Sequence, residues 1–101
     1  MAFRAVTTIS ELPAGARRAF LVDDREVVVC NVDGEIYAVD NVCSHDEGPL
    51  DEGAVVGCEI ECPRHGARFD LRDGRVTAPP AFLPIDVFPV RVVEGTVEVD
   101  V

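Results

Sequence analysis

The sequence contains no tryptophan and no lysine, and it has only one tyrosine and two histidines. All nine basic residues are therefore arginine, and because they are set against 19 acidic residues the formal net charge is −10. A field of this sign repels nucleic acid and favours partners with basic surfaces. Solubility, or a compositional bias of the source, explains the same balance equally well. We expect no nucleic-acid partner.

Long apolar runs are also missing. No stretch approaches the ~20 apolar residues that a membrane-spanning helix needs. The N-terminus, residues 1–4, lacks the basic region and apolar core of a signal peptide. A hydrophobic content of 48% in 101 residues predicts a folded chain and a single domain, residues 1–101. From these features we expect a cytoplasmic protein with no membrane partner.

Short β-strands separated by turn residues account for most of the chain, and no stretch shows a sustained helical period. Asp33-Gly34, Asp73-Gly74 and Glu94-Gly95 predict hairpins, because Gly and Asp tolerate the positive φ of tight turns. The predicted strands cover residues 3–9, 17–22, 26–32, 35–39, 54–61, 67–71, 75–77, 85–93 and 96–101. Strands this frequent predict an all-β fold, an antiparallel sandwich or barrel.

Two short segments each combine a cysteine with a histidine. Cys43 and His45 form a Cys-x-His box, and Cys62 and His65 form a Cys-x-x-His box sixteen residues later. These are the only histidines of the chain, and both stand at ligand spacing from a cysteine. A [2Fe–2S] centre with two Cys on one iron and two His on the other needs this donor set. We therefore predict these four residues as ligands of a metal centre.

The other two cysteines have no histidine nearby. Cys30 lies in an apolar run, residues 27–32, where a free cysteine is typically a small buried residue. Cys58 has the same strand parity as Val56 and Ile60, which favours the core face of the predicted strand 54–61. We expect both to be structural, although a Cys30–Cys58 pairing stays open.

The two boxes, Cys43-Ser44-His45 and Cys62-Pro63-Arg64-His65-Gly66, resemble those of the Rieske family. The resemblance implies a [2Fe–2S] cluster, with both cysteines on one iron and both histidines on the other. It also implies a small three-stranded cluster-binding subdomain, at about residues 41–82, inserted into a larger β sandwich or barrel.

Within that family, this sequence resembles the low-potential members. High-potential Rieske proteins join the two loops by a disulfide, and the matching positions here are Gly48 and Arg64. They also carry hydroxyl donors after the second box, where this chain has Ala67 and Phe69. Residues 44–61 include six acidic side chains and no basic one. We expect a potential near the low end of the Rieske range, about −150 mV.

Leu50, Gly53, Gly74 and the proline-rich segment 80–85 make the chain similar to the ferredoxin components of bacterial aromatic-ring dioxygenases. This resemblance implies a soluble one-electron carrier and not an enzyme. Its partners are then a flavin-containing, NAD(P)H-dependent reductase and a terminal non-haem iron oxygenase. It also implies that Pro80 covers the cluster and that the histidines face solvent.

Three alternatives remain open from the sequence. The same four ligands could hold a structural zinc ion, which accepts a Cys₂His₂ set. The chain could also be the small Rieske subunit of a nitrite reductase, or a donor to an unrelated oxygenase or a maturation system. The sequence argues against independent catalysis, because no histidine is left for acid–base chemistry once both are bound and no glycine-rich phosphate loop exists. The carboxylate pairs Asp46/Glu47 and Asp51/Glu52 fit a solvated loop face or an acidic docking patch.

Overall fold

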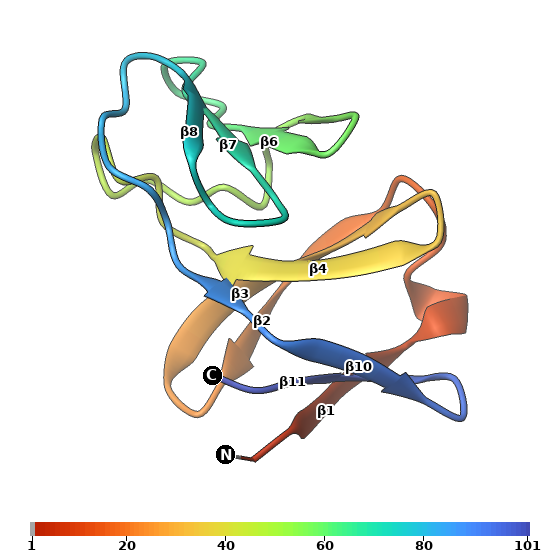
Figure 1. Ribbon diagram of the computed structural model, residues 1–101. Helices are drawn as coiled ribbons and strands as arrows, with labels where there is room; N and C mark the ends of the chain where they lie inside the picture. Colours follow the sequence, from red (N-terminus) through yellow and green to blue (C-terminus); the bar gives the residue numbers. More distant parts are fainter. Residues whose placement is uncertain (1) are drawn as a thin grey trace.

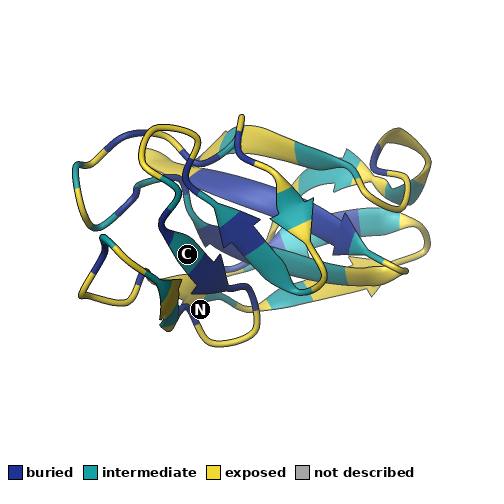
Figure 2. Ribbon diagram, turned by 90° about the horizontal axis from the view of Figure 1, so that it is seen from above, coloured by how far each residue is buried: buried dark blue, intermediate teal, exposed yellow. Residues whose placement is uncertain are grey.

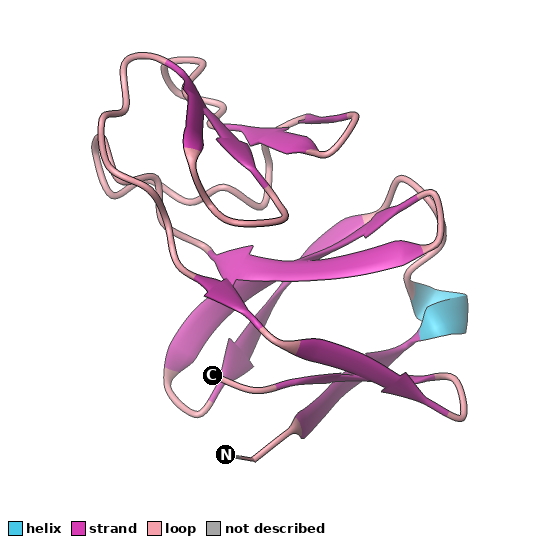
Figure 3. Cartoon of the chain, in the orientation of Figure 1, coloured by secondary structure: helices cyan, strands magenta, loops and turns pink. Residues whose placement is uncertain are grey.

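Eleven short strands and one turn of 3-10 helix, η1 (Ile9–Glu11), make up the regular structure in residues 2–101 of the computed structural model (Figure 3). The predicted all-β class is therefore confirmed. The strands are β1 (Arg4–Thr8), β2 (Arg17–Val22), β3 (Arg25–Val32), β4 (Glu35–Asp40), β5 (Val55–Val56), β6 (Glu59–Glu61), β7 (Arg68–Asp70), β8 (Val76–Ala78), β9 (Val87–Phe88), β10 (Val90–Val93) and β11 (Thr96–Val99).

The strands form three antiparallel sheets, stacked one above the other in Figure 1. The lower sheet has the order β1-β11-β10, the middle sheet β2-β3-β4-β9 and the upper sheet β5-β6-β7-β8. The upper sheet lies between β4 and β9 in the sequence, so it is an insertion into the other two. It has four strands where the family resemblance implied three. No helix among residues 2–101 is long and apolar enough to cross a membrane.

Strand β3 is buried on both faces, because the middle sheet has a neighbour on each side (Figures 1 and 2). Val27 and Val29 point into a core shared with Val97 and Val99 of the lower sheet. Residues 28 and 30 point the other way, into a second core that reaches the upper sheet. A strand covered on both faces needs a continuous apolar run instead of an alternating one, which explains the sequence of residues 27–30.

The predicted strand 54–61 is wrong, because a tight turn divides it into β5 and β6. Gly57 has a φ of +59° and reverses the chain, so that Val55 pairs with Ile60 and Val56 with Glu59. Side chains in both arms of a hairpin alternate between two faces with a period of two residues. The sequence pattern of these two short strands therefore looked like that of one longer strand. The assignment of Cys58 to the core face of this strand is therefore also wrong, because Cys58 lies in the turn.

Pro89 divides the predicted strand 85–93 into β9 and β10, which belong to different sheets. Proline has no N–H to donate to a ladder, and here β9 pairs with β4 of the middle sheet while β10 pairs with β11 of the lower sheet. Pro89 therefore marks the point where the chain passes from one sheet to the next. The predicted hairpins at Asp33-Gly34, Asp73-Gly74 and Glu94-Gly95 are confirmed by strand pairing.

Asp70 organises the hairpin between β7 and β8. Its side chain is 3% exposed and accepts hydrogen bonds from Arg72 Nε at 3.0 Å, Arg72 Nη2 at 2.7 Å and the Arg72 amide at 2.8 Å. The Arg72 guanidinium lowers the pKa of Asp70 to about 2. Because this pKa lies below the value in the unfolded chain, the ionised carboxylate stabilises the fold at neutral pH.

We predict that Asp70→Asn lowers the free energy of unfolding by roughly 2 kcal/mol at pH 7. The stabilisation is complete above the unfolded pKa of ~3.9 and is lost as the pH falls toward 2, so the variant and the parent should converge there. Urea unfolding at a series of pH values measures the difference. Asp73→Asn, an exposed position on the same hairpin, is the control. A difference between Asp70→Asn and the parent that is independent of pH would contradict the explanation.

Candidate metal centre

The two boxes lie in two loops, one that precedes the upper sheet in the sequence and one that connects two of its strands. The first loop, residues 43–48, follows β4, and the second loop, residues 62–67, connects β6 to β7. Cys43 and Cys62 are 0% and 1% exposed and belong to the same core as Val28, Val39 and Phe69. One continuous core therefore holds the starting points of both loops.

Both loops close with the same backbone hydrogen bonds. In the first, Cys43 N–H donates to the Gly48 carbonyl at 2.7 Å and the Glu47 amide donates to the Cys43 carbonyl at 2.7 Å. In the second, Cys62 N–H donates to the Ala67 carbonyl at 2.6 Å and the Gly66 amide donates to the Cys62 carbonyl at 3.0 Å.

The residue four after each cysteine has a positive φ, +61° at Glu47 and +80° at Gly66. Glycine reaches this region without strain, whereas glutamate does so at a cost. Sequence reasoning missed the likeness of the two loops, because the first places a glutamate where the second has the expected glycine.

This shared turn brings the four predicted donors together. The sulfur atoms of Cys43 and Cys62 lie within 4.8 Å of each other and of an Asp46 carboxylate oxygen. Ring nitrogens of His45 and His65 also lie within 4.8 Å of each other and of Asp46. The two imidazoles stand almost perpendicular, at 89°, with their centroids 5.2 Å apart.

Burial differs sharply between the two donor types. Both thiols are inside the protein, whereas His45 is exposed and the His65 side chain is 51% exposed. Burial raises the pKa of the Cys43 thiol, so a metal that binds there must displace a proton. Two inner sulfurs and two outer imidazole nitrogens fit a [2Fe–2S] cluster with mixed ligation.

Asp46 is not part of a solvated face, and that prediction is wrong. Its side chain is only 16% exposed, and it accepts a hydrogen bond from the Gly48 amide at 3.0 Å. Its other oxygen lies 3.1 Å from Arg64 Nε and 3.2 Å from His65 Nδ1. The Gly48 amide holds the pKa of this carboxylate below its ordinary value. Asp46 therefore links the first loop to the second and places a negative charge beside the donors.

Gly48 and Arg64, the two positions that the family resemblance matched to an interloop disulfide, are in contact. A Cβ on Gly48 would lie 2.6 Å from Arg64 Cδ. In place of a covalent link, the arginine crosses over the glycine to reach Asp46. Ala67 and Phe69 are fully buried and carry no hydroxyl group.

Asn41 supports the base of the first loop and was missed by sequence reasoning. Its side-chain oxygen accepts hydrogen bonds from the amides of Leu50 at 2.7 Å and Asp51 at 2.9 Å. Asn41 is 4% exposed. A polar residue directly after a strand is the only sequence signal for such a role, and many surface asparagines share it.

Cys30 and Cys58 lie outside the two loops, and all four cysteines are free. Cys30 is fully buried in the core between the middle and upper sheets, and burial raises its pKa to about 12. It is therefore a protonated core residue at neutral pH, as predicted. Cys58 is partly buried and packs against the same core.

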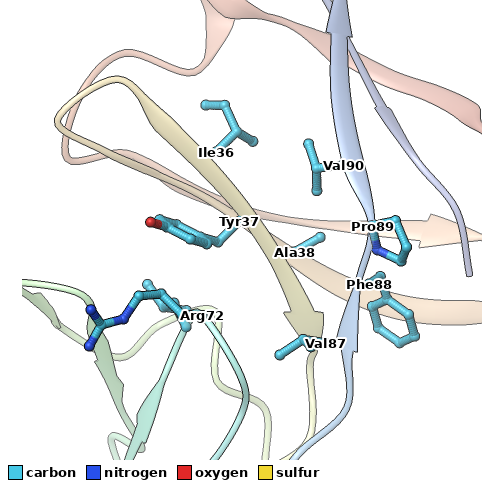
Figure 4. A pocket seen from close by; sticks show the side chains of 9 residues that line it. Ile36, Tyr37, Ala38, Arg72, Val87, Phe88, Pro89 and Val90 are labelled. Atoms are coloured by element: carbon cyan, nitrogen blue, oxygen red, sulfur yellow. The ribbon is translucent and has the colours of Figure 1, made fainter.

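An open groove lies away from the donors, along the seam between β4, β9 and the turn after β7 (Figure 4). Apolar side chains line it, with Tyr37 and Arg72 on one side. None of the four predicted ligands contributes to this groove. The arginine is paired with Asp70.

A small all-β domain that gathers two buried thiols and two exposed imidazoles at one tip belongs to the class of iron–sulfur domains with mixed ligation. Comparison with known proteins agrees. The Rieske [2Fe-2S] domain family matches residues 2–89. This chain therefore belongs to the Rieske [2Fe–2S] domain family, which is defined by that cluster.

Relatives cover nearly the whole chain. The ferredoxin component of the naphthalene 1,2-dioxygenase system of Pseudomonas aeruginosa is 38% identical over 90 residues, which cover 89% of this chain and 86% of the relative. The ferredoxin of carbazole 1,9a-dioxygenase from Nocardioides aromaticivorans IC177 is 40% identical, with a TM-score of 0.94 over 98% of this chain and 97% of that one.

A ferredoxin chain has also been solved in a complex of reduced oxygenase and oxidized ferredoxin in carbazole 1,9a-dioxygenase. It is 34% identical, with a TM-score of 0.90 over 96% of this chain and 91% of that one.

We predict that Gly53→Ala disturbs the second loop. A Cβ at this position would lie 1.7 Å from the carbonyl oxygen of Glu61, the residue before Cys62. Relief of this clash moves backbone, so we expect a loss of about 3 kcal/mol in unfolding free energy and a lower iron content. Chemical unfolding and metal analysis measure both.

Gly57→Ala is the matched control, because a Cβ there meets no atom within 4 Å and costs only the strain of its positive φ, about 1 kcal/mol. If Gly53→Ala were no more destabilising than Gly57→Ala, close approach would not explain this glycine.

Proposed function

We propose that this protein is a one-electron carrier in which Cys43 and Cys62 bind one iron of a [2Fe–2S] cluster and His45 and His65 bind the other. The observation that carries the proposal is the contrast in burial between the two thiols and the two imidazoles. When bound, the cluster supplies a reversible one-electron oxidation and reduction. The chain's own residues hold it, keep water from the sulfur side and present the imidazole edges to a partner.

We also propose that residues 41–82 act as the cluster-binding unit on a base formed by the lower and middle sheets. The upper sheet, the two loops and the first part of the return segment after β8 fall in this range. The base provides the strands that hold both ends of this unit, β4 before it and β9 after it.

The electron carrier is not itself an enzyme. The relatives are ferredoxin components of oxygenase systems, and this supports a carrier over a nitrite reductase subunit or a structural zinc module. The solved complex of a related ferredoxin with its oxygenase supports a terminal oxygenase as acceptor. As donor we propose a flavin-containing ferredoxin reductase that uses NAD(P)H, which places the exchange in the cytoplasm, where that cofactor is held.

A low reduction potential suits a carrier that accepts electrons from a reductase and passes them to an oxygenase. The fixed carboxylate of Asp46 opposes the extra negative charge that reduction brings. Ala67 and Phe69 provide no hydroxyl donor to stabilise that charge. We therefore propose a potential near −150 mV, at the low end of the Rieske range.

A reconstituted electron relay tests the function. NADH, a flavin-containing reductase from a naphthalene dioxygenase system, this protein and the matching oxygenase are mixed with naphthalene, and the diol product is measured. We expect product formation that requires this protein. If the reductase fails to reduce the protein and dithionite-reduced protein fails to reduce the oxygenase, the proposed function would be wrong.

Exchange of a ligand tests the assignment of residues. We predict that His45→Cys, where a cluster assembles, lowers the potential from about −150 mV toward the roughly −400 mV of all-cysteine ligation, because a thiolate replaces a neutral donor. Redox titration followed by visible spectra measures the shift. Cys58→Ser is the control and should leave spectrum and potential unchanged. An unaltered potential in His45→Cys would remove His45 from the ligand set.

A further inference from the structure

Two large apolar side chains project into solvent from the segment that returns over the ligand loops. Phe82 is 89% exposed and Leu83 is 65% exposed. Pro84 after them is also exposed, whereas Ala81 before and Ile85 after this exposed stretch are 4% and 7% exposed and belong to the core. The segment is thus held at both ends, while its tip exposes apolar surface that contributes nothing to either core. Exposed apolar surface of this kind marks interaction sites.

This tip is tied directly to the first ligand loop. Ser44 Oγ donates a hydrogen bond to the Leu83 carbonyl at 2.5 Å. Ser44 lies between Cys43 and His45, so the hydrogen bond fixes the apolar tip beside an exposed imidazole. Figure 1 shows the return segment after β8 running next to the loop that follows β4, at the upper left.

The charge around the tip is unbalanced. Arg64 is paired with Asp46, whereas Glu47 is exposed and has no ion-pair partner among residues 2–101. Glu47 lies in the same ligand loop as Ser44 and His45, so a partner that covers the exposed imidazole and the tip meets both an apolar projection and an unpaired carboxylate of this loop. Its complement is an apolar socket with a basic residue on the rim.

We propose that Phe82 and Leu83 are the anchor residues for the terminal oxygenase, inserted into an apolar socket whose basic rim faces Glu47. This inference rests on the proposed function, since the acceptor must approach the histidine edge. Buried aromatic anchors dominate binding energy, whereas rim charges mainly set the association rate. The tip therefore controls affinity for the oxygenase, and Glu47 controls salt-dependent encounter.

The test compares holoprotein variants in stopped-flow reduction of purified terminal oxygenases from the naphthalene, biphenyl and carbazole dioxygenase systems. We expect Phe82→Ala to weaken binding to the responsive oxygenase about thirtyfold, the equivalent of a 2 kcal/mol anchor residue. We expect Glu47→Gln to slow reduction only at low salt. The electron-transfer rate at saturating oxygenase should stay unchanged in both variants.

Leu21→Ala is the matched control. Leu21 is 71% exposed on β2, and the turn that follows it lies at the lower end of the molecule in Figure 1, away from the ligand loops. Its variant should bind like the parent. Oxidation by hexacyanoferrate(III), a small reagent that needs no socket, should be equal in all variants and shows that the cluster is intact.

Three results would overturn the inference. Equal binding of Phe82→Ala and the parent to the oxygenase would remove the anchor residue while leaving the proposed function standing. A loss confined to reduction by the flavoprotein reductase would assign the tip to electron entry instead. If the parent protein reduces none of the three oxygenases, the proposed acceptor class and this inference both fall.

Discussion

The structure depends on one hydrophobic core that lies between the middle and upper sheets and contains both cysteines proposed as ligands. Cys43 and Cys62 come from loops on different parts of the chain, and neither loop has enough apolar surface to fold alone. Burial of both cysteines against Val28, Val39 and Phe69 fixes where each loop starts, and a matching pair of backbone hydrogen bonds then fixes how each loop turns. Because thiols point into this core, the imidazoles that follow them are left at the surface. The separation of sulfur inside from nitrogen outside is thus a consequence of packing.

Charged contacts connect the two ligand loops to each other. Asp46 joins the two loops through its contacts with Arg64 and His65. Gly48 leaves the space that the arginine side chain occupies. The link between the loops is ionic, and one of its members is the carboxylate of Asp46. An ionic link stabilises less than a covalent one, but its charge acts on the electron that the cluster carries. We therefore expect Asp46 and Arg64 to affect both the stability of the two loops and the reduction potential of the cluster.

Sequence alone was sufficient for the all-β class and for most strands, and it singled out the four side chains that the two loops bring together. Strand β2 and the hairpin at Asp33-Gly34 follow from local pattern, because turn residues with positive φ leave a clear signal. The turn at Gly57 was missed, since the two arms of a short hairpin continue one alternating pattern. Asp46 and Asn41 were missed for another reason: their importance comes from contacts with residues distant in sequence or with backbone amides, which composition does not reveal. The likeness of the two loops was hidden by Glu47, a residue in a conformation that its type seldom adopts.

Pulsed electron paramagnetic resonance of the dithionite-reduced protein, together with iron and zinc analysis, tests the proposed ligand set. We predict two iron atoms per chain and a reduced cluster coupled to nitrogen from two histidines, with the coupling lost stepwise when His45 and His65 are replaced. A colourless protein that holds one zinc ion, or an iron cluster without histidine coupling, would contradict this proposal.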